Sequence, residues 1–504
     1  MQLRHGQYTV RWITLGLLIA SAGCKVTNED VDLWQGTIKG PGKMVAIILA
    51  DKFDMPLRVH AALALVEMER TDVEGVAELQ KALQTVDETT RNAVIDGMAD
   101  GLIALMSKPA EEKETEDAEA DTGPPPGQIR AKDAAFLLIP MGTDEARSKL
   151  TDAVVGWYTQ DFNGRNLSGN FSAEQVVRAL GAPAATKLVE ALNAKLPQAA
   201  LVKLAELIGQ LGRPATKTKA AAKLVAIEKE LNGDKFLSWL KNEIKTQIEA
   251  GGGKADPARV TKAASLNRAK FVEQGAIPAM KHLADQPLVA TRLLQIAADK
   301  NPAYTLRRVS ALQALEGKAR KEHLDKLLAL ALDPAAPVKV RDYAFDRVGD
   351  IRDPKAVPPM WPLVQSAKEQ RLRWRAGELV LAIGGQAVLA EFFSKLPAEA
   401  GTAYEPEELE GYATRMSLMT PLPSKIAKAQ LRSPDWWDQV IALRFFQRKG
   451  TESDVAAMSR LSKSSTAVKG TGWGKTKSVG GVAREAIAGL RERVKQAGGK
   501  GDAS

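Results

Sequence analysis

The sequence predicts an all-α protein, built as an α-solenoid (a superhelix) in which helical hairpins stack in series. Aromatic residues make up only 5% of the 504 residues, and the chain is rich in alanine, leucine and lysine, which favours helices over sheets. Apolar side chains recur at helical spacing along most of the chain. A pattern centred on arginine also returns about every 32–34 residues. A chain of this length is too long for one compact core. A stacked array of repeats has no such limit on length, because each unit packs only on its neighbours.

The first 24 residues have the features of an export signal. Arg4 and Arg11 give a positive start, and the apolar stretch at 13–20 is too short to span a bilayer. The run SAGC that follows resembles the lipobox of bacterial lipoproteins, although that family prefers leucine where Ser21 stands. The resemblance implies cleavage of the signal before Cys24 and transfer of a diacylglycerol to its sulfur, which anchors a protein to a membrane.

Cys24 is the only cysteine, so no disulfide can form within the chain. The alternative to lipidation is an ordinary secreted protein with a stray cysteine. The residue after the cysteine is Lys25. In bacterial lipoproteins an aspartate at this position signals retention in the inner membrane. By resemblance to lipoprotein sorting, this lysine implies the cell envelope, at the periplasmic side of the outer membrane.

The clearest repeat lies at 338–357. Val340 and Arg341 are followed by Ala344, then by Gly349 near a helix end, and Asp353 precedes a proline that opens the next helix. This pattern resembles the HEAT repeat. It predicts that Ala344 allows a close helix crossing, that Gly349 ends its helix in the left-handed conformation, and that Asp353 caps the next helix. Other copies contain Arg58, Arg91, Arg130, Arg178, Arg308, Arg373 and Arg484.

Changes in composition divide the chain further. An acidic run followed by prolines indicates a solvated linker, and a triple glycine indicates a flexible break. The predicted segments are the lipoprotein signal peptide at 1–23, the lipidated cysteine and tether at 24–42, N-terminal helical repeats at 43–110, the linker at 111–128, central repeats at 129–250, the glycine-rich break at 251–258, HEAT-like repeats at 259–400 and C-terminal helical repeats at 401–504.

No catalytic or metal-binding constellation is evident. His60, His282 and His323 are far apart in sequence and are expected to face solvent or to have partners within the fold. The run at 470–476 approaches a phosphate-binding loop, but Lys469 stands where the first glycine is required, which indicates an inter-helix loop. We therefore expect no cofactor, no metal and no enzymatic activity.

Two sets of side chains are candidates for binding a partner. Arg341 and Arg373 are able to hold an anionic group, and Trp374, Trp436 and Trp437 are able to anchor an interface. The alternatives are structural. By resemblance to HEAT proteins, the arginines form a ladder with an aspartate of an adjacent repeat, and the large aromatic side chains fill gaps between repeats.

These features predict a lipid-anchored scaffold or adaptor of the cell envelope that binds a protein or peptide on a helical-repeat surface. Two alternatives stay open: an enzyme or enzyme subunit with a pocket between helices, and a basic surface that binds anionic envelope polymers. The formal net charge of +9 suits the second alternative. The export signal argues against a nucleic-acid partner.

Overall fold

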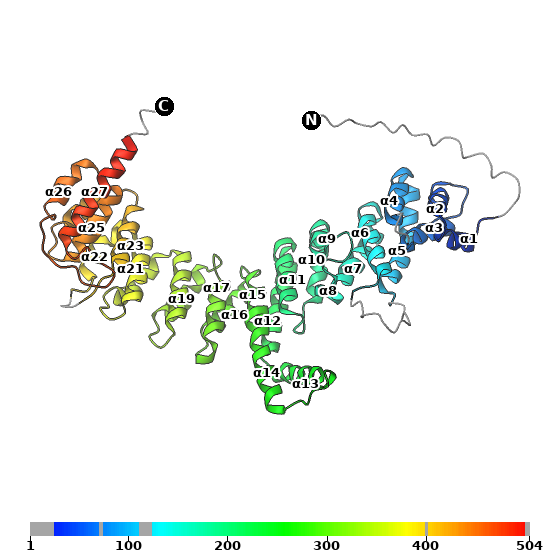
Figure 1. Cartoon of the computed structure of the whole chain (residues 1–504), viewed down its shortest axis with the longest axis horizontal. Helices are drawn as coiled ribbons and strands as arrows, with labels where there is room; N and C mark the ends of the chain where they lie inside the picture. The colour runs from blue at the N-terminus through cyan, green and yellow to red at the C-terminus, as the bar shows by residue number, and fades with distance from the viewer. Residues whose placement is uncertain (1–24, 70–73, 110–122, 399–401, 499–504) are drawn as a thin grey trace. The chain divides into compact units, whose positions relative to one another are not determined.

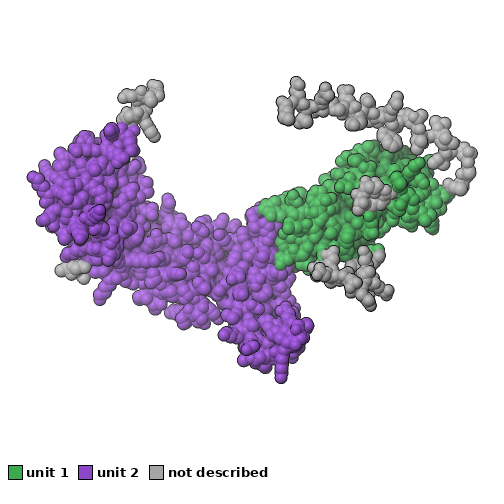
Figure 2. Space-filling view, viewed as in Figure 1, with its two compact units in different colours: residues 1–191, 211–213 green, residues 192–210, 214–504 purple. Residues whose placement is uncertain are grey.

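The computed structural model describes residues 25–69, 74–109, 123–398 and 402–498. Throughout these residues the regular elements are helices, and an isolated bridge between Ala467 and Ser478 is the nearest approach to a sheet. The contacts divide the chain into two compact units, 1–191 with 211–213 and 192–210 with 214–504 (Figure 2). The prediction of an all-α protein is confirmed.

Unit 1 consists of helices that pack on their neighbours along the chain (Figure 1). α2 packs on α3, α3 on α5, and α5 on both α6 and α7. The helices are α1 (Asn28–Gln35), α2 (Gly40–Leu49), α3 (Met55–Glu67), α4 (Gly75–Thr85), α5 (Glu88–Ser107), α6 (Pro126–Leu138), η1 (Ile139–Met141), α7 (Asp144–Gln160), α8 (Phe162–Arg165), α9 (Ala173–Leu180) and α10 (Ala182–Ala191).

Unit 2 also consists of helices. Its helices are α11 (Gln198–Leu211), α12 (Pro214–Leu231), α13 (Asp234–Ala250), α14 (Pro257–Lys270), η2 (Phe271–Ala276), α15 (Ile277–Lys281), α16 (Pro287–Ala297), η3 (Pro302–Tyr304), α17 (Thr305–Ala314), η4 (Lys321–His323), α18 (Leu324–Leu332), α19 (Val338–Ile351), η5 (Pro354–Ala356), α20 (Val357–Val364), α21 (Gln370–Gly384), η6 (Gly385–Val388), α22 (Leu389–Lys395), α23 (Pro406–Ser417), α24 (Ser424–Gln430), α25 (Trp436–Lys449), η7 (Glu452–Asp454), α26 (Val455–Ser459) and α27 (Val479–Gly498). The glycine-rich segment expected as a break lies between α13 and α14.

Two parallel rows of helices build most of unit 2. In the first row α17, α19, α21, α23, α25 and α27 pack one on the next, and in the second row α16, α18, α20 and α22 do the same. Each first-row helix from α17 to α21 also packs on the second-row helix that precedes it in the chain. This serial stacking of hairpins is the arrangement of an α-solenoid, as the sequence predicts.

Small buried side chains set the distance between the helices of neighbouring repeats. Ala311, Ala344 and Ala376 stand 33 and 32 residues apart in the first row, and each is 0% exposed. A methyl group at these positions lets the helix axes approach closely, so the predicted role of Ala344 is confirmed. Asp353 also has its predicted role, because its carboxylate accepts a hydrogen bond from the backbone N–H of Lys355 at 3.0 Å.

Gly349 differs from its predicted role as a helix terminator. It lies inside α19, and the left-handed residue that follows the helix is Arg352, with φ of 53°. A Cβ at Gly349 would stand 2.8 Å from Leu379 Cδ2 of α21. The missing side chain therefore serves the close approach of α19 to α21, and the turn falls three residues later.

One apolar stretch, 370–395, is long and apolar enough to cross a bilayer by composition. In unit 2 the stretch is divided between α21 and α22 by Gly385, whose φ is 58°. Leu372, Val380 and Phe392 from this stretch are buried in the solenoid core. The stretch therefore has the character of a repeat hairpin.

Candidate binding groove

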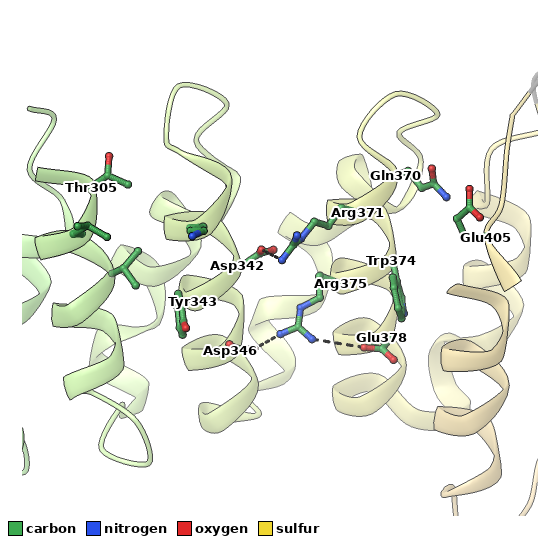
Figure 3. Close-up of a pocket in the computed structure, with 13 residues that line it drawn as sticks. Thr305, Asp342, Tyr343, Asp346, Gln370, Arg371, Trp374, Arg375, Glu378 and Glu405 are labelled. Carbon is green, nitrogen blue, oxygen red and sulfur yellow. Dashed lines mark hydrogen bonds and ion pairs between the residues drawn. The ribbon is translucent and has the colours of Figure 1, made fainter. Parts of the chain in front are cut away.

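A recess opens on the first row of unit 2, where α17, α19 and α21 lie side by side (Figure 3). Its volume is about 760 Å³. Thr305 lies at one end, and Gln370 and Glu405 lie at the other. We call this recess the groove, and all of the residues that line it belong to unit 2.

Two ion pairs join α19 to α21 in the wall of the groove. Asp342 Oδ2 lies 2.6 Å from Arg371 Nη2, and the carboxylate of Asp346 pairs with Arg375 (Figure 3). The two aspartates are one helical turn apart and so are the two arginines, so the pairs form parallel rungs. Because both arginines are partly exposed, each rung stabilises the fold by less than about 1 kcal/mol. The more important consequence is that four charged groups have fixed directions along the groove.

Apolar and aromatic side chains alternate with these charges. Leu306 of α17 is 66% exposed at the rim, and Tyr343 of α19 accepts a hydrogen bond on its hydroxyl from Gln313 at 2.9 Å. Trp374 is half-buried on α21, and its Nε1 would stand only 2.7 Å from a Cβ at Gly411 of α23. The absence of a side chain at Gly411 thus makes room for the indole against α23.

Three buried polar atoms in the groove have no hydrogen-bond partner among the described residues: Asp342 Oδ1, Asp342 Oδ2 and Trp374 Nε1. Of these, Oδ2 makes the ion pair with Arg371. Asp342 is only 8% exposed, so water has little access to its carboxylate. A buried polar atom without a partner costs about 1–3 kcal/mol. Because surrounding side chains cover Asp342 Oδ1, an occupant reaches it only when a neighbour moves aside. Arg371, which pairs with the same carboxylate and whose side chain is 70% exposed, has the freedom to do so. A hydrogen bond donated to Oδ1 by the occupant would then remove that cost.

Arg341 and Arg373, two of the predicted partner-binding residues, are buried between repeats. Arg341 donates from Nε to the backbone oxygen of Ala331 at 3.0 Å and pairs through Nη1 with Glu369 at 2.7 Å. Arg373 is 0% exposed and makes two hydrogen bonds to Glu408, at 2.7 and 2.8 Å. Neither guanidinium is free to hold an anion on the surface, because protein acceptors already surround it.

The repeat arginines have a shared structural role that differs in detail from the expected ladder. Arg58 donates to the backbone oxygen of Ile48 at 2.9 Å, and Arg308 donates to that of Ala297 at 2.8 Å. Together with the bond from Arg341, these contacts satisfy carbonyls at the C-terminal end of the preceding helix, where a cation is favoured. Backbone carbonyls are thus the recurring partner, and an acidic side chain is a second one.

Trp436 and Trp437 are also interior residues, 6% and 7% exposed. With Tyr404 and Trp473 they form an aromatic cluster in which the rings of Tyr404 and Trp437 stack at 5.3 Å. This is the gap-filling arrangement that the sequence left open as the alternative. Of the five predicted binding residues, only Trp374 lines the groove.

The glycine-rich run at 470–476 is a loop between α26 and α27 that packs on the start of α23. Trp473 donates from Nε1 to the backbone oxygen of Tyr404 at 3.0 Å, and Thr471 donates from Oγ1 to Glu405 at 2.7 Å. Gly470, Gly472 and Gly474 all have positive φ. The interpretation as an inter-helix loop is confirmed.

In the described part of the chain, no group of three His, Cys, Asp or Glu side chains is placed to hold a metal ion. His60 faces Asp32 at 2.8 Å, and burial lowers the pKa of both His282 and His323. Cys24 and its signal lie outside the described residues. The groove offers charges, aromatic rings and one unpartnered carboxylate oxygen, and no histidine, cysteine or serine lines it.

Asp342, Asp346, Arg371 and Arg375 are groove residues that sequence reasoning missed. The signal was present, since each pair is spaced i to i+4 on helices that the arginine pattern aligns. Recognising it requires the relative register of α19 and α21, which becomes known only when the two helices are packed.

No family model matches the chain, and no curated protein matches it in sequence. Among solved structures it is similar to Kap121p bound to Pho4p, with 12% identity over 92% of this chain and 50% of that chain, and a TM-score of 0.32. It is also similar to a Kap121p mutant (12% identity, 92% and 49% covered, TM-score 0.30) and to an engineered protein (16% identity, 90% and 98% covered, TM-score 0.16). The chain spans about half the length of the Kap121p chains it matches.

Proposed function

We propose that this protein is a lipid-anchored scaffold of the bacterial cell envelope, which binds a segment of a partner protein in the groove. The observation that carries the binding part is the unpartnered Asp342 Oδ1, set beside an exposed Leu306 and a half-buried Trp374. A suitable segment presents an apolar side chain to the aromatic wall and a hydrogen-bond donor to Asp342. No nucleophile paired with a base lies in the groove, so binding is favoured over catalysis.

Site-specific photo-cross-linking in cells tests the binding part. A photoreactive amino acid replaces Leu306 at the groove rim, and the matched control replaces Ala329, an exposed residue on second-row helix α18. We expect one protein to cross-link from position 306 and not from position 329. Trp374→Ala should lower the yield of the cross-linked product strongly. Asp342→Asn should lower it too, because the asparagine NH2 group is a donor and would face the partner's own donor.

Equal cross-linking from both positions, or no product from position 306, contradicts binding in the groove. Circular dichroism of the two variants shows whether the helices are intact, so loss of the product through misfolding is recognised separately.

The lipid anchor is supported by the sequence alone, through the export signal and the single cysteine that ends it. Metabolic labelling with radioactive palmitate should mark the protein, and Cys24→Ser should abolish both the label and membrane fractionation. An unlabelled, soluble periplasmic protein would refute the anchor and leave the groove proposal unaffected.

A further inference from the structure

Helices α13 and α14 form a two-helix arm that leaves the stacked rows of unit 2 (Figure 1). The two helices pack mainly on each other, while α12 packs directly on α15 and α16. The stacked helices therefore continue past the arm, from α12 to α15 and α16. At the base, Phe236 contacts both Trp239 and Phe271, with ring centroids 5.1 and 5.3 Å apart. We call residues 234–270 the arm.

A continuous helical path fixes the arm to the solenoid. α14 runs without a break through η2, which is a π-helical segment, into α15. Ile277 and Met280 of α15 are 0% exposed in the core. The arm is thus joined to the buried α15 by one helical path, and π-helical segments of this kind often accompany functional sites.

The arm concentrates positive charge. Its 37 residues contain eight basic and four acidic side chains, so this short segment carries +4 of the formal net charge of +9. α14 is more extreme, since its sequence PARVTKAASLNRAK has four basic residues and no acidic one.

One face of α14 holds most of this charge. Val260 and Ala264 are buried and define the face that packs on the arm's interior. On the opposite face, a stripe follows the helix at intervals of three, four and four residues. The basic stripe consists of Arg259, Lys262, Leu266 and Lys270, all exposed. It is about 16 Å long at 1.5 Å per residue.

The charges of the basic stripe are poorly neutralised by the protein itself. Arg259 is 89% exposed and lies 3.9 Å from Asp256, a pair that contributes little in water. Lys262 and Lys270 have no ion-pair partner among the residues that the structure describes. Leu266, between them, is 58% exposed. Three cations that repel one another around an exposed leucine are suited to an external anionic partner.

We propose that the arm is a membrane-contact element, whose basic stripe docks on anionic phospholipid headgroups while Leu266 enters the interface. The stripe lies on the convex surface of one helix that projects from the rows. A fluid array of headgroups adapts to such a surface. Long lysine and arginine stems keep their charges at headgroup level as an apolar neighbour sinks below them. This contact is independent of the groove and of the acyl chain.

Vesicle sedimentation tests the proposal. The protein is the full chain with Cys24→Ser, which removes acylation, and the probes are vesicles of phosphatidylcholine alone or mixed with phosphatidylglycerol. We expect binding to the mixed vesicles only, and a decrease as salt is raised. Arg259→Glu with Lys262→Glu and Lys270→Glu should lower the partition coefficient by a factor on the order of 100.

A matched variant keeps the same change of net charge elsewhere. Lys425→Glu with Lys463→Glu and Lys475→Glu alters three exposed lysines outside the arm and should leave vesicle binding within about twofold of the parent, since screened charges act locally. Leu266→Ala keeps every charge and should lower binding about threefold to tenfold. Circular dichroism checks that each variant is folded.

Three results would overturn the proposal: binding that ignores phosphatidylglycerol, equal loss in the two triple variants, or soluble polyglutamate that competes fully while Leu266→Ala has no effect. The last result would assign the stripe to an acidic polymer or protein.

Discussion

Arg373 and Glu408 face each other across 35 residues of sequence in a site that excludes water. Both side chains are 0% exposed, and the two hydrogen bonds between them measure 2.7 and 2.8 Å. Tyr412 donates a further hydrogen bond to Glu408 at 2.9 Å. Burial raises the pKa of Glu408, and the bonds from Arg373 oppose that rise. The pair links α21 to α23 and is satisfied only when both repeats are folded.

Removing one member of this pair should destabilise the protein severely. Arg373→Met leaves Glu408 buried without its counter-charge, and we expect a loss of about 3–5 kcal/mol in the free energy of unfolding. The double variant with Glu408→Leu should recover most of the loss. Urea unfolding followed by circular dichroism measures both changes.

Arg341→Met is the matched control, because its partner Glu369 is 39% exposed and can be hydrated when the arginine is gone. We expect this variant to lose clearly less stability than Arg373→Met. Equal losses would mean that the uncompensated charge of Glu408 is not the cause of the lower stability of Arg373→Met.

Asp438 should make the stability of unit 2 depend on pH. Burial raises the pKa of Asp438 to about 7 from 3.8, and the hydrogen bond from Ser433 opposes only part of that rise. The native state therefore holds this proton more tightly than the unfolded chain does. The free energy of unfolding should fall by on the order of 4 kcal/mol as pH rises from about 4 to about 7. Above that range it should level off.

Asp438→Asn keeps the shape of the side chain and cannot ionise. Its urea midpoint should therefore lack this part of the decline between pH 4 and 7. The difference in urea midpoint between the variant and the parent should be largest at neutral pH. A parent and variant with parallel profiles would show that Asp438 ionises normally in the native state.

The sequence predicts the repeats better than it predicts what they contact. Ala344 and Asp353 could be assigned because their roles depend on neighbours within a few residues. Gly349 was misassigned because a helix-ending glycine and a glycine at a helix crossing look alike in one repeat. The pairing of Arg373 with Glu408 depends on how one hairpin is aligned on the next. Repeats that match only loosely in sequence do not reveal that alignment.

The arm shows the same limit. The triple glycine at 251–253 predicted a break, yet not that the helices on both sides would leave the rows. The lack of acidic residues in α14 was a usable signal. It becomes interpretable only once Val260 and Ala264 show which face is buried.

Lys132 should hold a loop of unit 1 in place. The side chain is 0% exposed, and its Nζ lies 2.5 Å from Asp133, 2.8 Å from the oxygen of Ser168 and 3.1 Å from that of Phe171. Lys132→Met removes the donors that fix the loop and leaves the carboxylate of Asp133 buried. We expect faster cleavage within 160–172 in limited proteolysis, and a lower melting temperature.

Lys187→Met is the control, since that lysine pairs with Asp152 at the surface, where both side chains are at least one-third exposed. The pattern of cleavage should be that of the parent. Unchanged cleavage in Lys132→Met would mean that the loop is held by its other contacts.

Gly377 should be intolerant of a side chain. It lies in α21, where a Cβ would stand 2.6 Å from the ring of Tyr412, and that ring is 0% exposed and held by Glu408. Gly377→Ala therefore forces a fixed ring or a helix to move, and we expect a loss of about 1–3 kcal/mol. Gly156→Ala in α7 is the opposite case, because nothing lies within 4 Å of its Cβ and alanine is the better helix former by about 1 kcal/mol. Urea midpoints should thus shift in opposite directions for the same chemical change, and a stabilised Gly377→Ala would show that α21 and α23 are less tightly packed than the contacts indicate.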